Sequence, residues 1–136
     1  MDNDKLQEII STLSDKIEGQ KGNWRFTIKS TMLICLTDQF HNRMRIISPI
    51  DKLENITNEQ IIQCMKANFH TSLDARYSIS DGILWSAFIH PLKELTNEQV
   101  KSAISQVYSC AGTFGTHYSG GTLIFPTDEE RKSKEN

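Results

Sequence analysis

The amino-terminal segment carries apolar residues at intervals of three and four positions. This spacing places them on one face of a helix. Asn3 or Asp4 can cap the start of this helix, and Gly19 with Gly22 can end it. The segment therefore predicts a first amphipathic helix, and its apolar stripe comprises Leu6, Ile9, Ile10, Leu13 and Ile17.

Three segments that follow have the patterns of β-strands. Residues 24–29 alternate between apolar and polar side chains, so one face of this strand is exposed and its aromatic residues face the core. Residues 31–37 are apolar on both faces, which favours a place further inside the sheet. A third strand spans residues 43–48, and we expect it to stop at Pro49, because proline cannot donate a ladder hydrogen bond.

The tetrapeptide TNEQ occurs twice, at residues 57–60 and 96–99. In each copy the threonine and the glutamine three residues later have the pattern of a capping box, which predicts a helix start. Amphipathic spacing then continues to about His70 and to Ala111. Two interpretations of the repeat stay open. Good helix starts resemble one another, or the chain contains two copies of one unit of strand, proline and capped helix.

A β-hairpin is predicted between these two helices. Asp81–Gly82 separates two β-prone runs, residues 75–80 and 83–90, and suits a type I′ turn, which needs positive φ at both central residues. The second strand of this hairpin is apolar on both faces. Either a helix or the β-prone residues 122–125 cover its outer face, or that face binds a second subunit or a partner. In the second case the contact residues are Arg76, Ile83, Trp85 and Ile89.

The whole pattern predicts an α+β fold, an antiparallel sheet of about five strands packed with three helices. At 136 residues the chain fits one domain, which we place at residues 1–126, and the charged residues 127–136 are predicted to be a disordered polar tail. The order of elements is helix, three strands, helix, two strands, helix.

Composition narrows the function. The net charge of −2 and the scattered lysines and arginines argue against nucleic acid binding. The three distant cysteines and the four histidines lack metal-ligand spacing, so we expect buried thiols and neither a metal site nor a cofactor. The acidic amino terminus and the shortness of every apolar run predict a cytoplasmic protein without a membrane span.

Residues 4–112 resemble the class I type III secretion chaperones and the related YbjN-like bacterial domains. The resemblance rests on the order α-β-β-β-α-β-β-α, on Asn68 near the end of the second helix, on the Asp81–Gly82 hairpin, on the strand ILWSAFIHPL and on the capped third helix. It implies a bacterial, non-enzymatic and typically dimeric protein that holds an extended segment of a partner. Secretion chaperones are strongly acidic, whereas this chain is nearly neutral, so the resemblance bears more on the fold than on a secretion role.

The leading functional prediction is a chaperone-like or regulatory protein-binding module that acts as a homodimer. The second helix or the outer face of the hairpin is its expected contact surface. The competing prediction is a small enzyme or ligand-binding protein with a pocket near His90, His117 and Tyr118. It requires a polar cavity that brings these three side chains together.

Overall fold

The computed structural model describes residues 1–121 and confirms the α+β fold. The helices are α1 (Asn3–Leu13), α2 (Asn58–His70) and α3 (Asn97–Thr113). The strands are β1 (Lys16–Gln20), β2 (Asn23–Ile28), β3 (Thr31–Asp38), β4 (Arg43–Lys52), β5 (Arg76–Ser80) and β6 (Ile83–His90). The predictions for residues 122–125 and for the tail at 127–136 lie outside the described residues.

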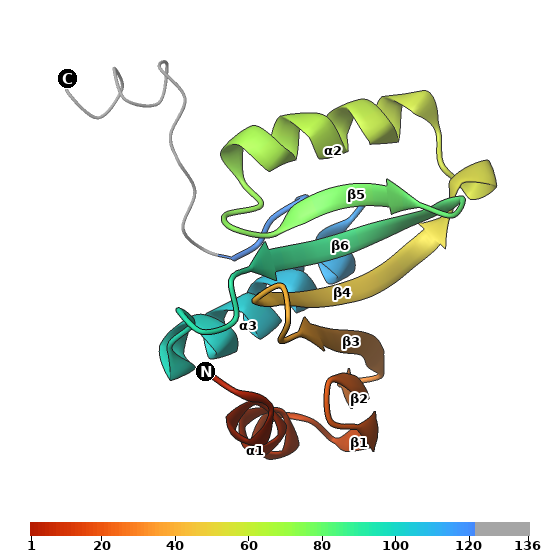
Figure 1. The fold of residues 1–136 in the computed structure, drawn as a ribbon. Helices are drawn as coiled ribbons and strands as arrows, with labels where there is room; N and C mark the ends of the chain where they lie inside the picture. Colours follow the sequence, from red (N-terminus) through yellow and green to blue (C-terminus); the bar gives the residue numbers. More distant parts are fainter. Residues whose placement is uncertain (122–136) are drawn as a thin grey trace, which may run out of the picture.

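The six strands form one antiparallel sheet in the order β1-β2-β3-β4-β6-β5. Figure 1 shows α3 behind this sheet, α1 at the end near β1, and α2 along β5. On the face that carries α3, the Ser86 hydroxyl on β6 donates to the Val107 carbonyl at 3.0 Å. The opposite face of β3, β4 and β6 carries no helix of the described chain.

The sixth strand, β1, was not expected from the sequence. The first helix ends at Leu13, and the Asp15 amide already donates to the Thr27 carbonyl on β2. Ile17, which continues the apolar stripe of the helix, lies on β1 opposite Phe26. Gly19 has a φ of +111°, and a Cβ there would lie 2.3 Å from the Asn23 carbonyl oxygen. Gly19 therefore permits a close strand pair, rather than ending a helix.

The prediction that the third strand stops at Pro49 is wrong. Strand β4 continues to Lys52, and Pro49 lies opposite Trp85 of β6 before a register shift. The pairing of β4 with β3 ends earlier, at Ile34 and Ile47. Because β4 is paired on one side only beyond Ile47, a residue without an N–H is tolerated there.

The two capping boxes and the hairpin turn are confirmed, whereas the first helix is capped by Asp2 and not by Asn3 or Asp4. Thr57 with Gln60 and Thr96 with Gln99 each form both hydrogen bonds of a capping box. The Asp81–Gly82 turn has φ values of 52° and 73°, and Ser80 pairs with Ile83 across it. These short-range signals therefore determine the starts of α2 and α3 and the register of the hairpin.

The core lies between the sheet and the three helices, and α2 contributes Cys64 and Ala67 to it. Trp24 and Phe26, each 1% exposed, face it as predicted. All three cysteines are free and buried in this core. The largest fully buried side chains are Trp24, Phe26, Leu6, Ile10, Leu33, Met44, Ile46, Leu84, Val100, Val107, Cys35 and Cys110.

Because its thiols are buried, the folded protein should lose stability as the pH rises in the alkaline range. Burial raises the pKa of Cys35 from 9.0 to about 12. Above pH 9 the unfolded chain loses this proton while the folded chain keeps it, so stability falls by about 1.4 kcal/mol per pH unit until the folded pKa is reached. In urea titrations, Cys35→Ala should be less stable than the parent at neutral pH, and the two stability curves should converge above about pH 9. Parallel curves would contradict this origin of the pH dependence.

Candidate protein-binding surfaces

The face of the sheet opposite α3, here called the outer face, is apolar in its centre. The strand registers place Ile34, Ile47 and Ala87 in one row across β3, β4 and β6. The same three strands extend this area with Met32, Leu36, Pro49, Trp85 and Ile89. Ile34 and Ile47 are half-buried by their neighbours, Ala87 is buried, and Ile89 is 56% exposed. Interior strands that are apolar on both faces require cover on both faces, and within residues 1–121 a helix covers these strands on the α3 side alone.

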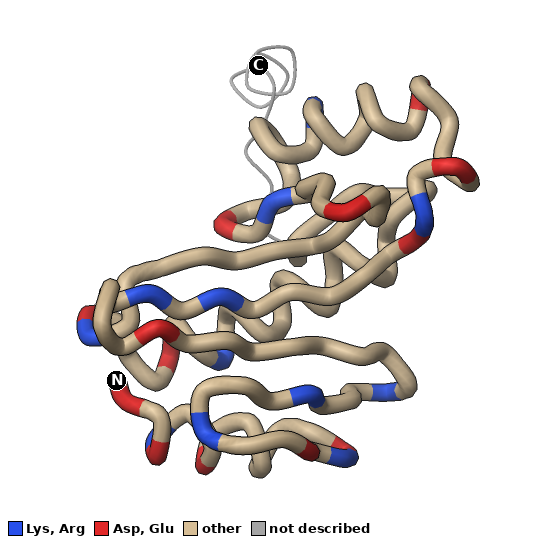
Figure 2. Tube along the Cα trace, turned by 45° about the vertical axis from the view of Figure 1, so that its right-hand side comes forward, with Lys and Arg blue, Asp and Glu red and all other residues tan. Residues whose placement is uncertain are grey.

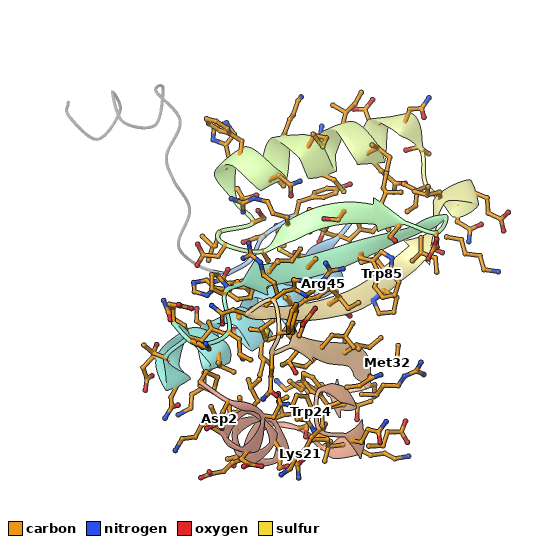
Figure 3. All side chains as sticks on the ribbon, in the orientation of Figure 1. Asp2, Lys21, Trp24, Met32, Arg45 and Trp85 are labelled. Atoms are coloured by element: carbon orange, nitrogen blue, oxygen red, sulfur yellow. The ribbon has the colours of Figure 1, made fainter. Side chains whose placement is uncertain are left out.

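Three of the predicted contact residues lie on this face of β6, and the fourth is next to them. Ile83, Trp85 and Ile89 alternate outward along the strand, and Arg76 of β5 lies opposite Ala87. The Trp85 indole N–H donates to the Ser80 carbonyl at 3.2 Å. Figure 3 shows Trp85, Met32 and Arg45 in relation to the strands. The structure thus brings the predicted residues onto one surface.

Cationic side chains surround the apolar centre. Arg45 lies between Leu36 and Ile89, and Arg25 lies opposite Ile34. Figure 2 shows blue segments, which mark Lys and Arg, along the strands of the sheet. By strand register the outer face carries six cations and two carboxylates. The cations are Lys16, Arg25, Arg43, Arg45, Lys52 and Arg76, and the carboxylates are Glu18 and Asp38.

The two carboxylates of the outer face do not neutralise its arginines by direct contact. Within residues 1–121 Lys21 forms an ion pair with Asp4 and the His41 ring bonds to Asp38, and no arginine contacts a carboxylate in this way. Hydrogen bonds from the backbone and side chain of His41 lower the pKa of Asp38.

A hollow of about 500 Å³ opens beside Arg43 and Arg45, and its lining includes Leu36, Asp38 and Ile89.

Helix α2 covers the free edge of β5 through one side chain. The Asn68 amide accepts from the Tyr77 N–H at 2.8 Å and donates to the Tyr77 carbonyl at 3.1 Å. These two bonds replace those that a further strand would make. The edge of β5 at Tyr77 is therefore closed to strand addition.

Replacing Asn68 with alanine should destabilise this edge. The change leaves both Tyr77 backbone groups without a partner, and we expect a loss of about 1–2 kcal/mol in the free energy of unfolding. The Tyr77 amide should also exchange its hydrogen faster. Asn58→Ala, at the exposed start of the same helix, is the matched control and should change stability by less than about 0.5 kcal/mol. Unchanged protection of the Tyr77 amide in Asn68→Ala would contradict this role.

The opposite side of α2 exposes a second apolar surface, here called the α2 stripe. It consists of Ile62, Met65 and Phe69, which are 54%, 66% and 82% exposed. Their spacing of three and four residues places them on one side of the helix, while Cys64 and Ala67 point inward. Large apolar side chains exposed together in this way are typical of an interaction surface.

A polar cavity of about 350 Å³ lies beyond the start of β5, between the end of β6 and α3. Gln106 is buried and lines this cavity. Its carbonyl oxygen accepts from the amides of Asp74, at 2.8 Å, and Ala75, at 3.1 Å. Arg76 donates to the carbonyls of Leu73 and Ala75 nearby. These bonds hold the loop that leads into β5.

The predicted pocket around three side chains is not assembled. His90 lines the polar cavity, and neither His117 nor Tyr118 is among its lining residues. His90 instead bonds to the Pro91 carbonyl, while Tyr118 packs against Tyr77 with ring centroids 6.1 Å apart. His117 is exposed.

Residues 1–121 also contain neither a metal-ligand group nor a membrane-spanning helix. No group of three or more His, Cys, Asp or Glu side chains in this part of the chain could hold a metal ion. None of the described helices is both long and apolar enough to span a membrane.

The sequence indicated only part of the outer face. It identified β6, but the contribution of Pro49 went unnoticed because the third strand was expected to stop there, and Ile47 was not assigned to a face. Period-two spacing from Arg43 onward already placed Arg45 and Ile47 on one side. Asn68 and Gln106 carried no usable signal for their contacts, because each bonds to a distant backbone segment.

Comparison of the sequence with protein-family models and with curated proteins finds no match. Solved structures do share the fold. A chain of the structure of the Yersinia pestis type III secretion chaperone SycH with a stable fragment of YscM2 superposes with a TM-score of 0.62 at 15% identity, over 83% of this chain and 98% of that one.

Two further structures match at 11% identity. One is the HopA1–SchA chaperone–effector complex, which superposes with a TM-score of 0.61 over 82% of this chain and 88% of that one. The other is the ExsC–ExsE complex, which superposes with a TM-score of 0.59 over 82% of this chain and 92% of that one. The chain therefore has a type III secretion chaperone-like fold, which confirms the resemblance seen in its sequence. At these identities the likeness concerns the fold alone.

Proposed function

We propose that this chain is a non-enzymatic, chaperone-like protein-binding module that acts as a homodimer and holds an extended segment of a partner protein on its outer face. The observation that carries the proposal is the uncovered apolar centre of that face. Ile34, Ile47 and Ala87 lie on interior strands, yet no helix of the described chain covers them. Trp85 and Ile89 add the kind of large side chain that anchors interfaces.

The solved structures with this fold support a protein partner. One is described as a chaperone–effector complex, another as a secretion chaperone with a stable fragment of a second protein, and the third as a complex of two proteins. Each of these chains is covered over most of its length, from 88% to 98%. By analogy, the partner here is a segment of another protein, and the setting is the bacterial cytoplasm, where buried free cysteines stay reduced.

The α2 stripe is the proposed dimer contact. It lies on a helix outside the sheet and is separate from the outer face, so dimer formation leaves the outer face accessible. Two copies of the stripe around a two-fold axis bury Ile62, Met65 and Phe69 against themselves. Such an isologous contact is the usual form of a homodimer interface.

A library of displayed peptides tests the binding function. Selection on the purified full chain should enrich peptides that bind it, and Ile47→Asp should weaken their binding at least tenfold, because it places a charge in the apolar centre. Ser105→Asp, on the exposed side of α3, is the control and should bind them as well as the parent does. The proposal fails if no peptide is enriched, or if enriched peptides bind Ile47→Asp as tightly as the parent.

A further inference from the structure

The charge of the outer face differs in sign from that of the chain. Six cations and two carboxylates occupy it by strand register, whereas the whole sequence carries a net charge of −2. Acidic residues are thus concentrated on the other parts of the molecule. A face with this composition attracts an anionic partner and repels a basic one.

Arg45 and Arg76 are the cations best placed to bind a partner carboxylate. Arg45 has apolar neighbours, Leu36 and Ile89, on both adjacent strands, and Arg76 lies opposite Ala87. The Nη1 group of Arg76 donates to the Leu73 and Ala75 carbonyls, so its Nε and Nη2 groups are the ones left for a partner carboxylate. In contrast, Arg25 lies opposite Glu18, and Arg43 lies opposite Asp38. A guanidinium on an apolar surface gains more from a partner carboxylate than a fully solvated one does.

The sheet fixes the distance between these two arginines. They are two strand spacings and two residues apart, which places their Cα atoms about 12 Å from each other. An extended peptide rises about 3.3 Å per residue, so two carboxylates four positions apart match this separation. In an extended segment, residues an even number of positions apart point to the same side. An apolar residue midway between the two carboxylates therefore points to the sheet as they do, and it contacts the row of Ile47 and Ala87.

We infer that the outer face selects an acidic partner segment, in which carboxylates spaced by four residues bind Arg45 and Arg76 and apolar residues between and beside them contact the centre of the face. This inference rests on the proposed function and specifies the partner. The apolar floor favours a peptide over a nucleic acid, since a polynucleotide needs stacking platforms and Trp85 is the one tryptophan on this face within the described chain.

Defined peptides test the inference by fluorescence anisotropy. The probe is a labelled nine-residue peptide, Leu-Ser-Glu-Ser-Leu-Ser-Glu-Ser-Leu. Three matched peptides replace both glutamates with glutamine, replace both with lysine, or move each glutamate by one position to the opposite side. The probe should bind at least tenfold more tightly than each of these, and added salt should reduce the difference.

Variants of the protein assign the effect to Arg45. Arg45→Glu should weaken binding of the acidic probe at least tenfold and strengthen that of the lysine peptide. Lys101→Glu, an exposed charge reversal on α3, is the control and should leave both unchanged. The Arg45 side chain makes no hydrogen bond within residues 1–121, so its replacement should not affect folding, which the circular dichroism spectrum checks.

The results separate this inference from the proposed function. Equal binding of the acidic, glutamine and lysine peptides overturns acidic selection, and the binding function then stands on the display experiment. Absence of binding by all four peptides overturns the inference, and the display experiment decides the proposed function independently. Two other results also overturn the inference. If a single-stranded oligonucleotide binds more tightly than the probe, and this binding depends on Arg45, then the face binds a nucleic acid. If Arg45→Glu converts a dimeric parent into a monomer, then the face binds a second copy of the chain.

Discussion

Met65→Glu is expected to convert the proposed homodimer into a monomer. Met65 lies between Ile62 and Phe69 in the α2 stripe and is 66% exposed in the single chain. In a two-fold contact it faces its own copy, so the substitution places two carboxylates in an apolar interface. The cost of burying these charges should raise the dimer dissociation constant at least a hundredfold, which corresponds to about 2.7 kcal/mol.

Light scattering after size exclusion, over a range of concentrations, measures this effect. Ser105→Glu adds the same charge to an exposed position of α3 and should leave the dimer intact. The folded state of Met65→Glu should be preserved, because the side chain is exposed in the single chain. A parent protein that is monomeric at every concentration, or a Met65→Glu variant that remains dimeric, would rule out the α2 stripe as the contact.

Gln106→Leu is expected to lower the free energy of unfolding by about 2–3 kcal/mol. Gln106 is 6% exposed, and its carbonyl oxygen accepts from the backbone amides of Asp74 and Ala75. Leucine fills a similar volume but accepts no hydrogen bond, so two amides of the loop before β5 lose their partner. A buried donor without a partner costs about 1–3 kcal/mol.

Chemical denaturation of the variant and of Ser105→Leu measures this loss. Ser105 precedes Gln106 and is exposed, so introducing leucine there should change stability by less than about 0.5 kcal/mol. The loop also supplies the Leu73 and Ala75 carbonyls to Arg76, so Gln106→Leu should weaken binding of the acidic probe as well. Equal stability of the two variants would show that Gln106 does not hold the loop.

Local chemistry explains what the sequence predicted well. The starts of α2 and α3 depend on a threonine and a glutamine three residues apart, and the Asp81–Gly82 turn depends on two residues that tolerate positive φ. Each signal is complete within four residues. By contrast, β1 was missed because Ile17 continues the helical spacing of α1, and only its pairing with β2 distinguishes a strand there.

The candidate site was predictable where it depends on one strand and unpredictable where it depends on several. Ile83, Trp85 and Ile89 alternate on β6, so their common face followed from the sequence alone. The position of Arg45 beside Ile89 requires the pairing of β4 with β6, two segments separated by α2 and β5. The contacts of Asn68 and Gln106 likewise arise only after the chain folds.

The two tryptophans provide the most direct test of the outer face as the binding surface. Trp24 is buried and its indole N–H donates to Gln7, whereas Trp85 lies on the outer face and its indole N–H donates to Ser80. In a proton–nitrogen correlation spectrum each indole gives its own signal. Titration with the acidic probe should shift the Trp85 indole signal and leave the Trp24 signal in place. A saturable shift of Trp24 alone, or binding that moves neither indole, would contradict the account.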